Sequence, residues 1–255
     1  MSDENQPNIS PQGIPIARTI PLRGIARITA KHMLKSHQEI AEVSGAWEVD
    51  FTALLAFRKQ LLSDLKDQPG LDVHISITHL MIKATAQALQ EHPLLNSTLT
   101  EMGGRRPSEI QILDEINISL AVALENGLLM TPVIRHADRK SLVEVAQEAA
   151  RLVKKARAGQ IELEDVMGGT FTFSNYGIVG GDVAKPIVNL PQSAILGLGR
   201  IVPKPVVVEG EIVIRSMAWL SMTCDHRIIN GLQAAFFSRT LEELINDPSR
   251  LELGL

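Results

Sequence analysis

The feature that most constrains the fold is a long apolar strand pattern that passes directly into a helical pattern near the C-terminus. The run from Ile212 to Thr223 predicts a strand. The segment from Leu232 to Ile245 has the spacing of an amphipathic helix. Between them lies Asp225-His226-Arg227, at the corner where strand becomes helix. This junction favours a fold in which helices pack against a sheet.

Four other segments predict helices. Three have apolar residues at helical spacing, at residues 27–40, 51–65 and 77–89. The fourth follows Ser141, which has the capping-box spacing to Glu144, and it ends at Gly159. Its single apolar stripe, from Leu142 to Ala156, makes it the best-defined helix in the sequence.

Extended segments are bounded by turn signals such as Asn126-Gly127 and Glu209-Gly210. The predicted strands, in addition to the long one, cover residues 46–49, 110–113, 116–124, 128–134, 170–174, 194–198 and 206–208. Strand-rich and helix-rich stretches are partly segregated and partly interleaved. The sequence therefore predicts an α/β fold in which helices pack on one large mixed β-sheet.

The chain of 255 residues, with 45% apolar and 21% charged residues, is expected to form one domain. Residues 1–18 are rich in Pro, Asn, Gln and Ser, which predicts a flexible N-terminal lead before a domain that spans residues 19–255. No apolar run has the length of a signal sequence or a bilayer span, so we expect no export and no membrane insertion.

Composition and motifs exclude several classes of function. A net charge of −4 argues against nucleic acid or an anionic membrane as a partner. The single cysteine, Cys224, forms no internal disulfide, which favours a reducing compartment, and we expect the cytoplasm. The seven histidines lack zinc-site spacing, so no metal is expected. The sequence contains neither a G-x-S-x-G elbow nor a phosphate-binding P-loop.

His226 is the first candidate for catalysis. A histidine at a strand-to-helix corner has a set direction and one free nitrogen, as a general base requires. Considered without other evidence, a histidine at such a corner more often has a structural role, in which its ring makes hydrogen bonds to nearby backbone carbonyl groups. Ser174 has a similar alternative as a turn-capping hydroxyl, and the pairs Gly168-Gly169 and Gly180-Gly181, taken alone, are typical of turns.

Three motifs together resemble one family. The segment Thr223 to Gly231 resembles the D-H-R-x-x-D-G motif of the dihydrolipoamide acyltransferases, the core components of 2-oxo acid dehydrogenase complexes. Gly168 to Gly177 resembles that family's G-G-T-F-T-I-S-N-x-G, and Pro186 to Gly197 resembles its P-x-I-N-x-P-Q-S-A-I-L-G. Together with the family's helix before them, at residues 138–159, the motifs keep the family's order and spacing from about Pro21 to the C-terminus.

This resemblance implies a two-layer fold of the chloramphenicol acetyltransferase type. It also implies a homotrimer, or a larger cubic or icosahedral assembly, with active sites in channels between subunits. Coenzyme A and a dihydrolipoyl arm would enter a channel from opposite ends. In that family's scheme His226 deprotonates the attacking thiol, and Ser174 of a different subunit donates a hydrogen bond to the oxyanion.

Asn230 is a departure from the family pattern. The motif most often has Asp at this position, where it pairs with an Arg near the start of the domain. In this chain the matching register places Ala26 where that Arg would be. We therefore include Asn230 among the site residues, as a neutral group that holds the His226 loop, with Arg27 as an alternative partner.

A second departure concerns the acyl carrier. Family members carry lipoyl domains ahead of the core, whereas only about twenty residues precede it here. The acyl donor is therefore expected to be a lipoyl group on a partner protein, or a different thiol carrier that replaces it. Decarboxylase and dihydrolipoamide dehydrogenase components are expected as further partners. A non-catalytic trimeric scaffold is the alternative function. Transfer to a hydroxyl is less favoured, because that branch has His-His in place of Asp225-His226.

The acyl group is expected to be acetyl. The run from Gly127 to Pro132 resembles the G-L-x-T-P of pyruvate-type cores more than the G-L-x-x-P-V of succinyl-type cores.

Overall fold

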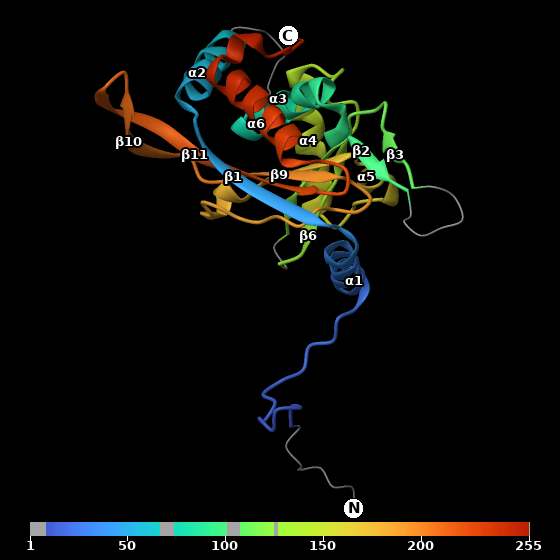
Figure 1. The fold of residues 1–255 in the computed structure, drawn as a ribbon. Helices are drawn as coiled ribbons and strands as arrows, with labels where there is room; N and C mark the ends of the chain where they lie inside the picture. Colours follow the sequence, from blue (N-terminus) through green and yellow to red (C-terminus); the bar gives the residue numbers. More distant parts are fainter. Residues whose placement is uncertain (1–8, 67–73, 101–107, 125–126, 255) are drawn as a thin grey trace, which may run out of the picture.

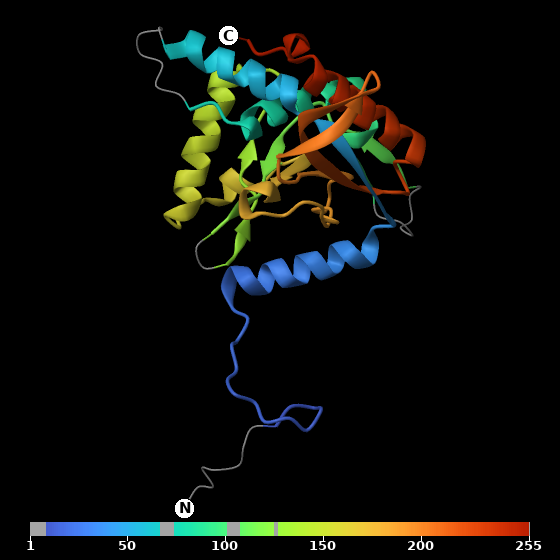
Figure 2. The same cartoon turned by 90° about the vertical axis from the view of Figure 1, so that its left-hand side faces the viewer.

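A computed structural model describes residues 9–66, 74–100, 108–124 and 127–254. Figure 1 shows a layer of helices above a twisted sheet, and Figure 2 shows the same arrangement from the side, with α1 (Gly24–Glu39) on the opposite side of the sheet. The other helices are α2 (Thr52–Lys66), α3 (Ile77–Glu91), α4 (Leu142–Arg157), α5 (Leu163–Val166) and α6 (Gly231–Asn246), with short 3-10 turns η1 (Pro93–Leu95), η2 (Tyr176–Val179) and η3 (Pro248–Arg250).

The main sheet is mixed, as predicted. Within the described residues its strands follow the order β1-β11-β9-β8-β4-β7, with β10 paired to β11. Their bounds are β1 Glu42–Asp50, β4 Ile118–Leu120, β7 Val133–Ile134, β8 Phe171–Asn175, β9 Ala194–Leu198, β10 Val202–Val208 and β11 Glu211–Asp225. Strand β8 runs parallel to both β4 and β9, and the remaining pairs are antiparallel.

Four short strands form two small separate sheets. These are β2 (Ser97–Leu99) with β3 (Ile110–Ile112), and β5 (Val122–Ala123) with β6 (Leu129–Met130). The single strand predicted for residues 116–124 is therefore divided, because β4 pairs with β7 and β8 whereas β5 pairs only with β6.

The predicted junction of strand and helix is confirmed as β11 followed by α6. Strand β1 is longer than the predicted residues 46–49. It pairs with β11 along its whole length, from Glu42 opposite Asp225 to Asp50 opposite Met217. The first part of β1 contains Ser44 and Gly45, which carry no apolar alternation, so only the neighbouring strand makes this part extended.

The two faces of the sheet differ in chemistry. Side chains alternate along each strand, so one face carries buried apolar residues that pack against the helix layer, including Phe173, Leu196 and Met222. Phe171 of β8 contacts Phe237 of α6, with ring centroids 6.0 Å apart. The residues between them in the strands face the other way and carry a row of hydroxyls, at Ser44, Ser119, Thr172, Ser174, Ser221 and Thr223.

Helix α3 begins with a capping box in which a histidine acts as an acceptor. The Ser76 hydroxyl accepts the backbone N–H of His79 at 3.3 Å, and Nδ1 of His79 accepts the backbone N–H of Ser76 at 3.2 Å. Burial is the main cause that lowers the pKa of His79 from 6.5 to about 4, and the nearby His74 and Arg58 contribute to the same shift. The imidazole is therefore neutral in the folded protein near neutral pH.

This neutral histidine makes stability depend on pH. The unfolded chain takes up a proton at this side chain below about pH 6.5, whereas the folded chain does so only near pH 4. The stabilising contribution of neutral His79 to the free energy of unfolding is complete above pH 6.5 and is lost as the pH falls towards 4. Between pH 8 and pH 5 the free energy of unfolding should fall by about 2 kcal/mol. Urea unfolding at both pH values should show this loss. His79→Gln keeps an acceptor for Ser76 and should reduce the loss; an unchanged pH dependence would contradict this role for His79.

No helix among the described residues has the length and apolar character needed to cross a membrane.

Candidate active site

The turn that holds His226 is fixed by its backbone. His226 donates its N–H to the carbonyl of Ala41 at 2.8 Å, and Asp225 donates its N–H to the carbonyl of Ser193 at 2.8 Å. The carbonyl of Asp225 accepts the N–H groups of the next two turn residues, Ile228 and Ile229, at 3.0 and 2.9 Å. The turn is thus tied both to the segment before β1 and to the segment before β9.

An ion pair between Asp225 and Arg227 closes the turn. The Asp225 carboxylate accepts Nε of Arg227 at 2.9 and 3.0 Å, Nη2 at 2.5 Å and the backbone N–H of Arg227 at 3.0 Å. These bonds raise the pKa of Arg227, which stays charged. Asp225 is buried and Arg227 is folded back onto it, whereas the His226 side chain is exposed, and within the described part of the chain nothing bonds to its ring.

Asn230 is the N-cap of α6. Its Oδ1 accepts the backbone N–H groups of Leu232 and Gln233, each at 3.0 Å, and its own N–H donates to Oε1 of Gln233 at 2.8 Å. No hydrogen bond or ion pair among the described residues joins it to Arg27, the alternative partner considered above. Asn230 therefore holds the end of the His226 turn by starting the following helix rather than by pairing with an arginine.

Ser174 lies near the end of β8, half-buried on the hydroxyl face of the sheet. The other hydroxyls of that row have partners: Ser44 with Thr223 at 2.9 Å, Ser119 and Thr172 with Gln192 at 3.0 and 2.5 Å, and Ser221 with Tyr176 at 2.9 Å. The Ser174 hydroxyl has no partner within the described residues. It is therefore available to donate to a bound molecule.

Glycines allow close packing around this strand end. A Cβ at Gly169 would lie 1.9 Å from Oγ of Ser119, and one at Gly197, opposite Ser174, would lie 2.5 Å from the ring of Tyr176. The interpretation of Gly168-Gly169 as a simple turn is thus incomplete. Gly168 does have a positive φ of 77°, but Gly169 is required for space.

Ser174 and His226 of one chain are far apart. In the sheet Ser174 of β8 is level with Gly197 of β9, which is level with Ser221 of β11. Ser174 is therefore two strand spacings from Ser221 of β11, and His226, directly after the end of β11, lies five residues beyond Ser221. Strand geometry then places the two Cα atoms roughly 15–20 Å apart. One chain cannot bring both side chains to the same reacting carbon.

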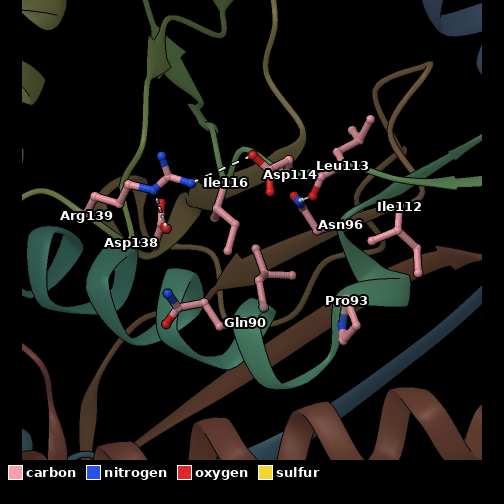
Figure 3. A pocket seen from close by; sticks show the side chains of 10 residues that line it. Gln90, Pro93, Asn96, Ile112, Leu113, Asp114, Ile116, Asp138 and Arg139 are labelled. Carbon is pink, nitrogen blue, oxygen red and sulfur yellow. Dashed lines mark hydrogen bonds and ion pairs between the residues drawn. The ribbon is translucent and has the colours of Figure 1, made fainter.

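Two of the cavities formed by the described residues lie away from both side chains. The larger, of about 500 Å³, is lined by the end of α3, residues 112–116 and the turn at Asp138 and Arg139. Figure 3 shows Arg139 between Asp114 and Asp138, with N–O distances of 3.9 and 3.6 Å. The second, of about 400 Å³, adjoins residues 168–170 and Gln192. Neither is lined by Ser174 or His226.

Two other chemistries find no support near the turn. Burial raises the pKa of the Cys224 thiol to about 12, so it is a poor source of thiolate. In the ranges that the structure describes, no three His, Cys, Asp or Glu side chains gather as a metal site.

The sequence of this chain is similar to those of known acyltransferases. A family model described as the catalytic domain of 2-oxoacid dehydrogenases acyltransferase matches residues 15–253. An acetyltransferase component of a pyruvate dehydrogenase complex from Mycoplasma capricolum is 39% identical over 231 residues, which cover 90% of this chain and 50% of the relative. A probable succinyltransferase component of the 2-oxoglutarate dehydrogenase complex from Schizosaccharomyces pombe is 38% identical, with coverages of 88% and 48%. The chain thus spans about half the length of these curated relatives.

Solved structures of acyltransferase cores are similar to this chain in fold as well as in sequence. The cubic core of a pyruvate dehydrogenase multienzyme complex matches with a TM-score of 0.87 and 32% identity, covering 97% of this chain and 98% of that one. A dihydrolipoamide acetyltransferase from Azotobacter vinelandii matches with a TM-score of 0.85 and 32% identity, covering 93% and 94%; it was studied for the role of a serine, a histidine and an asparagine in its catalytic mechanism. Chloramphenicol acetyltransferase, at 16% identity and a TM-score of 0.50 over 89% of this chain and 99% of that one, shares the fold and confirms the expected fold class.

Proposed function

This chain belongs to the family of 2-oxoacid dehydrogenase acyltransferase catalytic domains, and on that premise we propose that it transfers an acyl group between dihydrolipoamide and coenzyme A. The transfer is a direct thioester exchange. His226 is the general base and Ser174 is the oxyanion donor. Asn230 acts indirectly, by starting the helix that ends the His226 turn.

The steps follow from thiol chemistry. A thiol with a pKa of about 8.5 is mostly protonated at neutral pH, so His226 takes the proton as the sulfur of coenzyme A attacks the thioester carbonyl of acyl-dihydrolipoamide. The oxygen of the tetrahedral intermediate carries a negative charge, to which Ser174 donates a hydrogen bond. When the carbon–sulfur bond to the dihydrolipoyl group breaks, the leaving thiolate regains the proton from His226. The reverse transfer uses the same groups.

The observation that carries the proposal is the separation of Ser174 from His226. Each side chain is accessible and without a partner in the described residues, yet roughly 15–20 Å of sheet lies between them in one chain. A shared reacting carbon therefore requires the serine of one chain and the histidine of another. In the Azotobacter vinelandii protein the three residues studied have spacings of 52 and 4, which are also the spacings from Ser174 to His226 and from His226 to Asn230.

An assembly of several copies is part of the proposal. The hairpin of β10 and β11 exposes Val207, Ile212 and Ile214, and such apolar surface is typical of contacts between proteins. We propose a homotrimer as the catalytic unit, within a larger core such as the cubic one of the related complex. The dihydrolipoyl group would be carried by a partner protein, together with decarboxylase and dihydrolipoamide dehydrogenase components, in the cytoplasm.

Acetyl is the proposed acyl group, on the basis of the run from Gly127 to Pro132. Relatives with acetyl and with succinyl substrates are about equally similar to this chain, at 39% and 38% identity. Comparison of kcat/KM for acetyl-, succinyl- and isobutyryl-coenzyme A with free dihydrolipoamide tests the choice. If kcat/KM is higher for succinyl- or isobutyryl-coenzyme A, that acyl group replaces acetyl in the proposal, and the proposed reaction type is unchanged.

Mixing two inactive variants tests the shared site. Chains with Ser174→Ala or His226→Ala alone should each have almost no exchange activity. After equal amounts are unfolded and refolded together, random assembly gives each site an intact serine and an intact histidine in about one case in four. We therefore expect roughly a quarter of wild-type activity, measured as exchange between dihydrolipoamide and acetyl-coenzyme A.

The control is each variant refolded alone. If mixing restores no activity although the copies co-assemble, the two residues do not meet across chains. If the wild-type protein itself has no activity that depends on His226, the scaffold alternative is favoured. The asparagine in the mechanism of the Azotobacter vinelandii enzyme removes one of the reasons for that alternative, because Asn230 is then no sign of lost turnover.

A further inference from the structure

The residue after Ser174 is anchored to a helix on the other side of the sheet. Nδ2 of Asn175 donates a hydrogen bond to the hydroxyl of Thr78, at the start of α3, with a distance of 2.9 Å. Successive strand residues point to opposite faces, so Asn175 points to the helix layer and Ser174 to the hydroxyl face. A bond that fixes Asn175 therefore also fixes the direction of Ser174.

At this point strand β8 is paired with a neighbouring strand on one side only. On its β4 side the ladder ends with Leu120 opposite Phe173, one residue before Ser174, and the last bond there runs from the N–H of Ala121 to the carbonyl of Phe173. On its β9 side the ladder continues to Asn175 opposite Leu198, although Gly197, opposite Ser174, has no side chain to pack against the serine. The bond from Asn175 to Thr78 thus adds a side-chain attachment where β8 no longer has its second neighbouring strand.

Helix α3 is a rigid anchor for this bond. Its first turn is closed by the capping box of Ser76 and His79, which bracket Thr78, and its middle is buried between α4 and α6. The position of Thr78 is therefore set by the core of the domain rather than by the loop that it supports.

We propose that Thr78 is a positioning residue for acyl transfer, which acts through Asn175 to aim the hydroxyl of Ser174 at the oxyanion. This inference rests on the proposed function of Ser174. Thr78 itself contacts no substrate. Its effect comes from the alignment of the donor, and misplacement of a catalytic group by about 1 Å can lower the rate by roughly 100-fold.

The test compares Thr78→Val, which has nearly the same shape but no acceptor, with Thr78→Ser, which keeps the hydroxyl. We expect Thr78→Val to lower kcat for exchange between dihydrolipoamide and acetyl-coenzyme A by roughly 10-fold to 100-fold, with KM for both substrates unchanged. Thr78→Ser should keep wild-type kcat within about 3-fold, because its hydroxyl remains available as an acceptor.

Thr85→Val is the matched control. Thr85 lies on the same helix, fully buried, and its hydroxyl has no partner among the described residues. The same change there should leave kcat unchanged, and thermal unfolding of all variants confirms that they fold. If Thr78→Val has the kcat of Thr85→Val, the positioning role is wrong.

A double-mutant cycle separates this inference from the proposed function. If Thr78 acts only through Ser174, then Thr78→Val should have no further effect on kcat in a Ser174→Ala background. If it lowers kcat by the same factor there, Thr78 has a general structural role and the inference is overturned, while the role of Ser174 stands. If Ser174→Ala alone leaves kcat unchanged, the proposed role of Ser174 and the inference both fail.

Discussion

Replacement of His226 by alanine should lower kcat for acyl exchange by about 10²- to 10⁴-fold, the range that a general base contributes. The loss follows from the chemistry of the attacking thiol, which remains protonated without a base near its sulfur. Stability should hardly change, because the bond that the structure shows for His226 uses its backbone N–H, which alanine retains, and the side chain is exposed.

The measurement is steady-state exchange with acetyl-coenzyme A together with thermal unfolding. His37→Ala is the control, because His37 is also an exposed histidine and lies outside the proposed site. Added imidazole should restore part of the activity of His226→Ala, since it can enter the space that the side chain leaves. If His226→Ala keeps more than about a tenth of wild-type kcat, His226 is not the base.

Ser174→Ala should lower kcat by about 10²- to 10³-fold, the loss seen when one oxyanion donor is removed. The hydroxyl interacts with the charge that develops on the oxygen during attack, so KM should stay near its wild-type value. Folding should be unaffected, because no hydrogen bond of this hydroxyl to another described residue is lost.

Ser44→Ala provides the matched control on the same face of the sheet. It removes the 2.9 Å bond to Thr223, which should cost about 1 kcal/mol of unfolding free energy and leave kcat unchanged. Ser174→Thr, which keeps a hydroxyl, should retain more activity than Ser174→Ala. Equal loss of kcat in Ser174→Ala and Ser44→Ala would mean that the hydroxyl face matters only for folding.

Much of the fold could be predicted because periodicity reports which face of an element is buried. The apolar stripe after Ser141 correctly predicted α4, and the run from Ile212 to Thr223 correctly predicted β11. Strand β1 was predicted too short, since Ser44 and Gly45 are extended only because β11 lies beside them. The predicted strand at residues 116–124 was wrong as a single element, because its two parts pair with different neighbours.

The site could be predicted in part. His226 and Ser174 were found through motifs whose meaning came from resemblance to a family, and their catalytic roles remain predictions. The contribution of Thr78 left no signal, because a threonine at the start of a helix looks like any other. Thr78 is connected to the site only by its hydrogen bond with Asn175, which is 97 residues away along the chain.

The sequence by itself determined that this chain forms a mixed sheet with helices on it, that a histidine ends the long strand, and that the family motifs keep their order. These properties follow from local spacing and residue type, which act over a few neighbours. Only the tertiary structure decided that Ser174 and His226 of one chain are too far apart to act together, that Asn230 caps α6, and that Thr78 supports the strand end beside Ser174. These depend on the register of strands and helices that are distant in sequence, and no local pattern encodes that register.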